Sequence, residues 1–219
     1  MKPVYIKFRK LNLQWLLGLS FLTGCTTVTD LPHYVVINNA ECANREVLTT
    51  PAKEVSFPLS AENQTIVDLL VEKFRQEKNC AGLAAPQIGF NCRIIVFSAP
   101  DDPKLKKWRP DLSDTMGETL WLNPSYQGLS DKKFSDYEGC FSVHGLGGPV
   151  ARFEEISYRA YNAQGKIIEG KAKGFLARII QHEVDHLNGI LFWDLIEKDQ
   201  LLPIETYRKI RSDALKQGR

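Results

Sequence analysis

Two histidines four residues apart, His182 and His186, constrain this chain more than any other feature of its sequence. In an α-helix, positions i and i+4 lie one above the other on the same face, so both imidazoles can reach one metal ion. Glu183 lies beside that ion, where it can take a proton from a bound water. The stretch His182-Glu183-Val184-Asp185-His186 therefore predicts a central metal-binding helix in a hydrolase.

Cys140, in the segment Glu138-Gly139-Cys140-Phe141-Ser142, is the best candidate for a third ligand. One thiolate and two imidazoles leave a fourth position open for water, which is typical of a catalytic metal site. The alternative is a pair of hydrogen-bonded core histidines and an unrelated buried thiol. The histidine spacing, together with Glu183 and Cys140, favours the metal site.

The hydrophobic pattern predicts a second helix and several short strands. Ser60 is the expected N-cap of a helix that runs to about residue 78, and Gly189 is the expected stop of the histidine-bearing helix over 174–188. Strands are expected over 93–97, 119–122 (stopped at Asn123-Pro124), 155–161 and 165–168.

Two further segments complete the predicted fold. Small residues with Pro86 and Gly89 predict a tight segment over 81–89, where a ligand or another backbone comes close. Residues 99–117 are rich in Pro, Asp and Lys and are interpreted as an exposed connector. The predicted class is α+β, with short β-strands and hairpins packed around the central helix that carries both histidines.

The length of 219 residues, with 43% hydrophobic and 25% charged residues, suits one catalytic domain, which we place at residues 45–200. A C-terminal helical tail is expected over 201–219. The formal charge of +2 is too small to indicate nucleic acid as a partner, and we expect a monomer. The cysteines at 42, 80 and 92 show no disulfide pattern and are interpreted as free thiols.

The first 25 residues differ in composition from the rest. Four basic residues precede the apolar stretch 15–22, and Leu22-Thr23-Gly24-Cys25 resembles a bacterial lipobox. This order predicts a signal peptide over 1–24, a lipid on Cys25, a tether over 25–44 and a lipid-anchored protein of the cell envelope. Without a working leader the protein would be cytoplasmic, and Cys25 an ordinary thiol. The apolar run is too short for a stable transmembrane helix.

Three segments resemble, in order and at similar separations, the signature motifs of peptide deformylases. The resemblance extends from about residue 47 to residue 194, and it implies a peptide deformylase-like fold. Phe141 stands where the family usually has Leu, and His144 where proline is common. The three segments are Leu83-Ala84-Ala85-Pro86-Gln87-Ile88-Gly89, Glu138-Gly139-Cys140-Phe141-Ser142 and Gln181-His182-Glu183-Val184-Asp185-His186.

The resemblance implies a role for each matching residue. Cys140, His182 and His186 would bind the metal, and Glu183 would act as general base and acid. The Gln87 side chain and the Phe141 backbone N–H would stabilise the oxyanion. The remaining implied positions are Gly82 and Gly139 against the substrate backbone, Phe141 and Ile179 lining an apolar pocket for a methionine-like side chain, and a Glu138–Arg152 pair near the site.

The implied reaction is removal of the N-formyl group from formyl-methionyl peptides or proteins by metal-bound hydroxide, giving formate and a free amine. The resemblance favours Fe²⁺ as the single divalent metal ion, with Zn²⁺ as the alternative, because ligand type alone does not choose between them. Two other hypotheses stay open: an HExxH metallopeptidase, and a non-catalytic lipoprotein that retains the fold. The product distinguishes a deformylase from a metallopeptidase: the first releases formate, and the second releases two peptide fragments.

Overall fold

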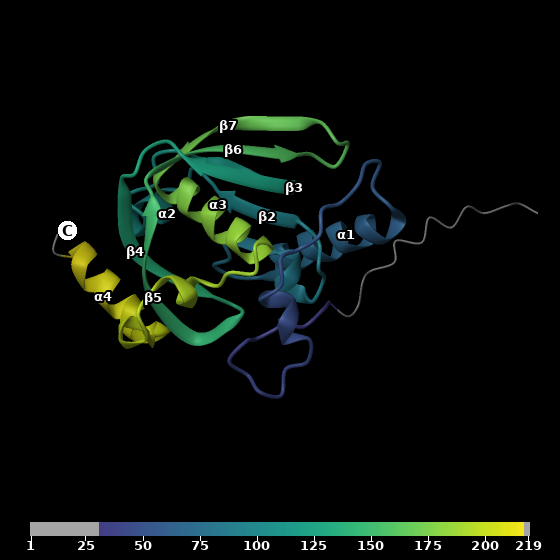
Figure 1. The fold of residues 1–219 in the computed structure, drawn as a ribbon. Coiled ribbons are helices and arrows are strands. Elements are labelled where there is room, and N and C mark those ends of the chain that lie inside the picture. The colour runs from purple at the N-terminus through teal and green to yellow at the C-terminus, as the bar shows by residue number, and fades with distance from the viewer. Residues whose placement is uncertain (1–30, 217–219) are drawn as a thin grey trace, which may run out of the picture.

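The computed structural model describes residues 31–216, and its helices and strands form the α+β arrangement predicted above (Figure 1). A large sheet curves around one central helix, α3, and a smaller sheet stands at its side. The elements are α1 (Ala61–Gln76), β1 (Gly82–Ala84), β2 (Ile94–Ala99), α2 (Pro103–Trp108), β3 (Met116–Gly128), β4 (Lys133–Cys140), β5 (Val143–Phe153), β6 (Glu155–Tyr161), β7 (Ile167–Lys173), α3 (Gly174–Leu187), β8 (Leu202–Pro203) and α4 (Ile204–Lys216).

The larger sheet has five antiparallel strands in the order β1-β2-β3-β6-β7. Successive side chains of a strand point to opposite faces, and in β2 both faces are buried. Ile95 and Phe97 pack in one core with α3, whereas Ile94 and Val96 pack in another with α1. The uninterrupted apolar run that predicted this strand thus reflects helices on both sides of the sheet.

The helix predictions are confirmed. The Ser60 hydroxyl accepts a hydrogen bond from the Asn63 N–H at 3.1 Å and so caps the start of α1. Gly189 follows α3 with φ of +74°, the left-handed conformation in which glycine commonly ends a helix. The predicted hairpin is also present as β6 and β7, and its turn includes Gly165 with φ of +76°.

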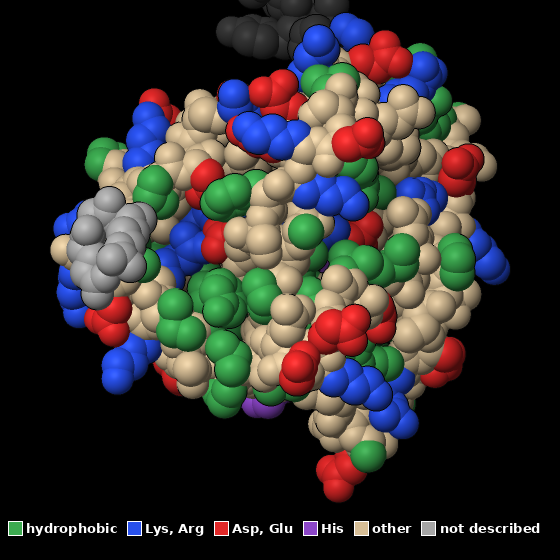
Figure 2. Space-filling model, turned by 60° about the vertical axis from the view of Figure 1, so that its left-hand side comes forward, with side chains coloured by type: hydrophobic (Ala, Val, Ile, Leu, Met, Phe, Trp, Pro, Cys, Tyr) green, Lys and Arg blue, Asp and Glu red, His purple; other side chains and the backbone are tan. Residues whose placement is uncertain are grey.

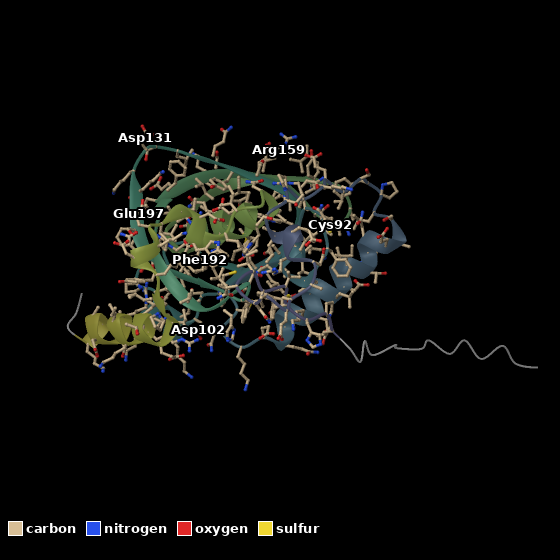
Figure 3. All side chains as sticks on the ribbon, turned by 60° about the horizontal axis from the view of Figure 1, so that its bottom comes forward. Cys92, Asp102, Asp131, Arg159, Phe192 and Glu197 are labelled. Carbon is tan, nitrogen blue, oxygen red and sulfur yellow. The ribbon has the colours of Figure 1, made fainter. Side chains whose placement is uncertain are left out.

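The smaller sheet has the order β4-β5-β8, and sequence analysis did not predict it. β4 and β5 form a long hairpin that leads into and out of the segment around Cys140. A 3-10 helix, Phe192–Leu195, packs against β5, and Phe192 is 1% exposed. Figure 3 shows Phe192 well inside the molecule, while Asp131 and Arg159 point outward from its edge.

Two predictions about the middle of the chain are wrong. β3 does not stop at Asn123-Pro124 but continues to Gly128, because a register shift between Leu122 and Ser125 accommodates the proline. Asn123 has φ of +46° at this irregularity. Residues 99–117 are not simply an exposed connector either, since they contain α2 and the buried Arg109 and Leu112.

The described N-terminal residues, 31–44, lie against the domain rather than away from it. The Val35 N–H donates to the Gln87 carbonyl, and the Ile37 N–H to the Ser142 carbonyl. The signal peptide predicted over 1–24 and the lipid predicted on Cys25 fall outside the described residues. Within 31–216, no helix is long and apolar enough to cross a membrane.

The predicted C-terminal helical tail is present as α4, of which Tyr207 is buried. Charged side chains of both signs are interspersed on the face drawn in Figure 2, with apolar side chains near its middle. The cysteines of the described part, Cys42, Cys80, Cys92 and Cys140, are all free.

Candidate active site

Helix α3 carries His182, Glu183 and His186, and its start is held by a distant segment. The Phe175 N–H donates to the Asp111 carbonyl at 3.0 Å, which satisfies a backbone group that a helix leaves without an internal partner. The Gln181 side chain accepts a hydrogen bond from the Phe153 N–H and donates one to the Phe153 carbonyl, each 2.9 Å long. The helix is therefore fixed to β5 just before its first histidine.

Cys140, at the end of β4, meets these two histidines. Its Sγ lies 3.2 Å from His186 Nε2, and the ligand atoms of Cys140, His182 and His186 all lie within 4.8 Å of one another. The structure thus brings together three donors that are 46 residues apart at the extremes. The pairing of β4 with β5 shifts in register between Gly139 and Cys140, and Cys140 then pairs with Val143 only three residues later. The chain therefore turns back directly after Cys140.

The Glu138 carboxylate contacts both His182 and the buried Arg152. One of its oxygens lies 2.8 Å from His182 Nδ1, so this contact leaves Nε2 of His182 for a metal. Arg152 donates two hydrogen bonds to the Glu138 carboxylate, each 2.9 Å long. Burial alone would raise the pKa of Glu138, but Arg152 and His182 outweigh it and hold that pKa well below its usual range.

Two further members of this network were not predicted. Arg178 of α3 donates to Glu138 at 2.7 Å and to the carbonyls of Phe134 and Val150. Asp185, inside the histidine motif, forms an ion pair with Arg152. The sequence analysis assigned no role to either residue, because only the packing of β4 and β5 against α3 gives Asp185 and Arg178 their partners.

The histidines have opposite electrostatic surroundings. Burial, and then the charge of His182, lower the pKa of His186 well below its usual value, which keeps its ring neutral. Burial would also lower the pKa of His182, but contacts with Cys140 and Glu138 outweigh it and raise that pKa. The anionic groups that attract a proton to His182 also attract a metal cation.

Glu183 faces the same place from one residue further along α3. Its side chain is nearly fully buried, and Oε2 has no hydrogen-bond partner among the described residues. Burial raises the pKa of Glu183 to about 7, which suits a group that takes and gives a proton near neutral pH. Such a buried carboxylate, with an oxygen still free, can act on a water molecule bound beside it.

Gln87 comes from the segment between β1 and β2. Its Oε1 accepts a hydrogen bond from the Ala84 N–H at 2.8 Å, so its amide group is oriented with Nε2 toward the site. Nε2 lies 3.3 Å from Cys140 Sγ. The predicted tight segment over 81–89 is present as β1 and a 3-10 helix, Ala85–Ile88, and this local geometry aims Gln87.

A cavity of about 920 Å³ opens onto these groups. Of the predicted residues near the metal site, only the buried His186 and Arg152 do not line it. It is also lined by four residues that were not predicted, from the end of α2, from β4 and from α4: Trp108, Arg109, Tyr137 and Tyr207. The predicted residues on its wall are Gly82, Gln87, Glu138, Gly139, Cys140, Phe141, Ile179, His182 and Glu183.

The donor set fits one divalent metal ion. A thiolate and two imidazoles are a ligand combination that Fe²⁺ and Zn²⁺ accept. Glu138 contacts the His182 ring, Gln87 contacts the Cys140 sulfur, and His186 is buried. The Glu183 carboxylate and the Gln87 amide line the same cavity as Cys140 and His182. His144, in contrast, is exposed, and its backbone bonds Asn38, so the structure places it outside the site.

Gly82→Ala is expected to lower kcat strongly while metal content stays the same. A Cβ at position 82 would lie 2.4 Å from Glu183 Oε1, so the carboxylate would have to move. A displacement of about 1 Å at a reacting group costs on the order of 10²-fold in rate. Gly117→Ala is the matched control, because a Cβ there has no described neighbour within 4 Å. Equal rates for the two variants would contradict the close contact.

Arg152→Met is expected to destabilise the domain by roughly 3–5 kcal/mol, because it leaves the buried carboxylates of Glu138 and Asp185 without their cation. Urea denaturation followed by circular dichroism measures the change in free energy of unfolding. Arg159→Met is the control: its ion pair with Glu169 is exposed, so little change is expected. A loss no larger than that of the control would show that the network contributes little to stability.

Comparison with known proteins finds relatives that match most of this chain. The sequence profile of polypeptide deformylases matches residues 37–201, well over half of the chain. A Rickettsia conorii protein named peptide deformylase 2 is 48% identical over 190 residues, which is 86% of this chain and 94% of the relative. A peptide deformylase of Dictyoglomus turgidum is 37% identical over 159 residues, 73% of this chain and 92% of the relative.

Solved structures agree with the sequence comparison. The crystal structure of a class I type b peptide deformylase from Acinetobacter baumannii, with Met-Ala-Ser bound, has a TM-score of 0.64 and 31% identity. That match covers 76% of this chain and 99% of the other. A peptide deformylase from Thermotoga maritima has a TM-score of 0.62 and 25% identity, and the match covers 77% and 99% of the two chains.

Proposed function

This chain belongs to the polypeptide deformylase family, whose members are hydrolases that remove N-formyl groups, and we propose that its substrates are peptides that begin with formylmethionine. One observation carries this proposal. Three metal-ligand candidates lie within 4.8 Å of one another, and two of them line one cavity together with a buried carboxylate and an oriented amide. The Acinetobacter baumannii relative was crystallised with Met-Ala-Ser, the kind of peptide that removal of a formyl group would leave.

Cys140, His182 and His186 would hold the metal ion. When bound, the ion supplies a Lewis acid that polarises the formyl oxygen and lowers the pKa of a neighbouring water molecule. The family uses a single divalent ion, and we infer Fe²⁺ from the resemblance, with Zn²⁺ as the alternative. Glu138 would keep the His182 ring oriented through its contact with Nδ1.

Glu183 would take the proton from the attacking water and pass it to the departing amine. Its burial favours both steps, since a carboxyl group with a raised pKa is a stronger base when ionised and is readily protonated in turn. Gln87 Nε2 and the Phe141 N–H would donate to the oxygen on which negative charge develops. Gly82 leaves space for the formyl group beside Glu183, because a side chain there would meet the carboxylate.

An HExxH metallopeptidase is the other candidate from the sequence, and the site disfavours it. Such enzymes usually take their third ligand from downstream of the motif, whereas the group that meets both histidines here is the upstream Cys140. Export by residues 1–24 and a lipid on Cys25 stay predictions, since these residues lie outside the described part of the chain.

The decisive test is the product formed from a formyl-methionyl tripeptide by the anaerobically purified full chain. Formate and an intact tripeptide with a free amine are expected. The N-acetyl tripeptide is the matched control and should react far more slowly, because its extra methyl group enters the space beside Gly82. Cleavage of an internal peptide bond would support the metallopeptidase, and no product with metal-loaded protein would support a binding role.

A further inference from the structure

The segment Tyr34–Ile37 touches both loops that carry the proposed oxyanion donors. The Val35 N–H donates to the carbonyl of Gln87 at 2.8 Å. Two residues later, the Ile37 N–H donates to the carbonyl of Ser142 at 2.9 Å. Gln87 supplies one donor, and Ser142 directly follows Phe141, which supplies the other. One short piece of chain therefore bridges two loops that are more than 50 residues apart in sequence.

Tyr34 adds a side-chain contact to this bridge. Its ring stacks on the ring of Phe141, with centroids 4.7 Å apart and an interplanar angle of 5°. The ammonium of Lys73, on α1, lies 4.3 Å from the centre of the Tyr34 ring. Phe141 lines the cavity and Tyr34 does not, so Tyr34 supports Phe141 from behind. The ring of Phe141, which lines the cavity, is thus stacked on a ring that does not line it.

Further contacts hold the same segment in place. Asn38 and His144 exchange two hydrogen bonds of 2.9 Å between side chain and backbone. Val35 is buried in the apolar cluster that contains Val143 and against which Cys140 packs. The ring contact joins Tyr34, which precedes the family-matched range 37–201, to Phe141, which stands where the family usually has Leu.

We propose that Tyr34–Ile37 clamps the two donor loops together and that Tyr34 is a positioning residue for the reaction. This inference rests on the proposed function for its effect on rate. Donors aimed at a developing oxyanion act mainly in the transition state, so misplacing them lowers kcat and leaves KM nearly unchanged. Removal of a whole donor costs about 10²–10³-fold. Loss of the Tyr34 ring would leave the Phe141 donor in place but less firmly held, so kcat is expected to fall by about tenfold, less than when a donor is removed.

The test uses four variants of the full chain. Tyr34→Ala removes the stacking ring, and Tyr34→Leu removes it while keeping apolar volume, in case the alanine variant folds poorly. Tyr34→Phe keeps the ring and loses only a hydroxyl that has no hydrogen-bond partner among the described residues. His33→Ala is the control, since His33 is the exposed neighbour. Each variant is compared by metal content, thermal midpoint, hydrogen exchange and formate release.

Faster amide exchange is expected in segments 84–89 and 138–144 for the alanine and leucine variants, with kcat about tenfold lower and KM unchanged. The phenylalanine variant should restore both properties to those of the parent and the His33 control. Unchanged exchange in the leucine variant overturns the clamp, and faster exchange with unchanged kcat overturns the positioning role. If the parent itself releases no formate, the proposed function fails, and the exchange measurement still decides whether the clamp exists.

Discussion

Replacement of Glu183 by glutamine is expected to lower kcat for formate release by about 10²–10⁴-fold, the usual contribution of a general acid–base group. Glutamine has nearly the same shape, so the cavity and the contact with Gly82 are kept. What is lost is the ability to hold a proton, which the buried carboxylate does with a pKa of about 7. Metal content should not change, because Glu183 is not among the three converging ligands.

The measurement is single-turnover formate release with metal content determined on the same sample. Glu169→Gln, on the exposed strand β7, is the matched control for loss of a carboxylate. Unchanged turnover in Glu183→Gln would remove Glu183 as the base and would require a different proton acceptor. Loss of metal together with turnover would instead place Glu183 among the ligands.

Cys140→Ser is expected to lower metal affinity by more than the 10–100-fold that loss of an outer-shell partner typically costs, and to abolish most activity. A serine hydroxyl is a harder and far less acidic ligand than a thiol, so it does not replace the thiolate for Fe²⁺ or Zn²⁺. The charge of the thiolate would also be lost beside His182, whose raised pKa reflects that neighbour.

Cys80→Ser is the control for this prediction. Cys80 lines the same cavity, and its Sγ donates to the Gly82 carbonyl at 3.1 Å, a contact that a serine hydroxyl also makes. Equilibrium dialysis under anaerobic conditions, with Fe²⁺ and with Zn²⁺, gives the affinity of each variant. Retention of metal by Cys140→Ser at parental affinity would contradict the ligand assignment and leave the two histidines to bind with some other group.

Much of the site was predictable because it is local. His182, Glu183 and His186 share one helix, and helical periodicity alone places both imidazoles on one face. The choice of Cys140, Gln87 and Phe141 came from resemblance to a family, because no property of those segments by itself indicates that they meet α3. Their convergence on one cavity depends on the pairing of β4 with β5 and on the register of β1 with β2.

The errors share one physical cause. β3 was expected to end at Pro124, although a bulge removes the need for the missing N–H, and such bulges depend on the neighbouring strands. The segment 99–117 is polar, yet Arg109 is buried because Asp111 and Asp136 neutralise it. Composition describes a residue without its partners, and here the partners come from elsewhere in the chain.

The sequence by itself determined the class of fold and a helix whose two histidines suit a metal ion, because hydrophobic periodicity and the histidine spacing are local properties. Only the tertiary structure decided which groups surround that ion. Arg178 joins Glu138 across 40 residues, and Val35 and Ile37 reach Gln87 and Ser142 across still longer separations. Hydrogen bonds and ion pairs form between neighbours in space, and long-range neighbours are set only when the sheets and helices pack.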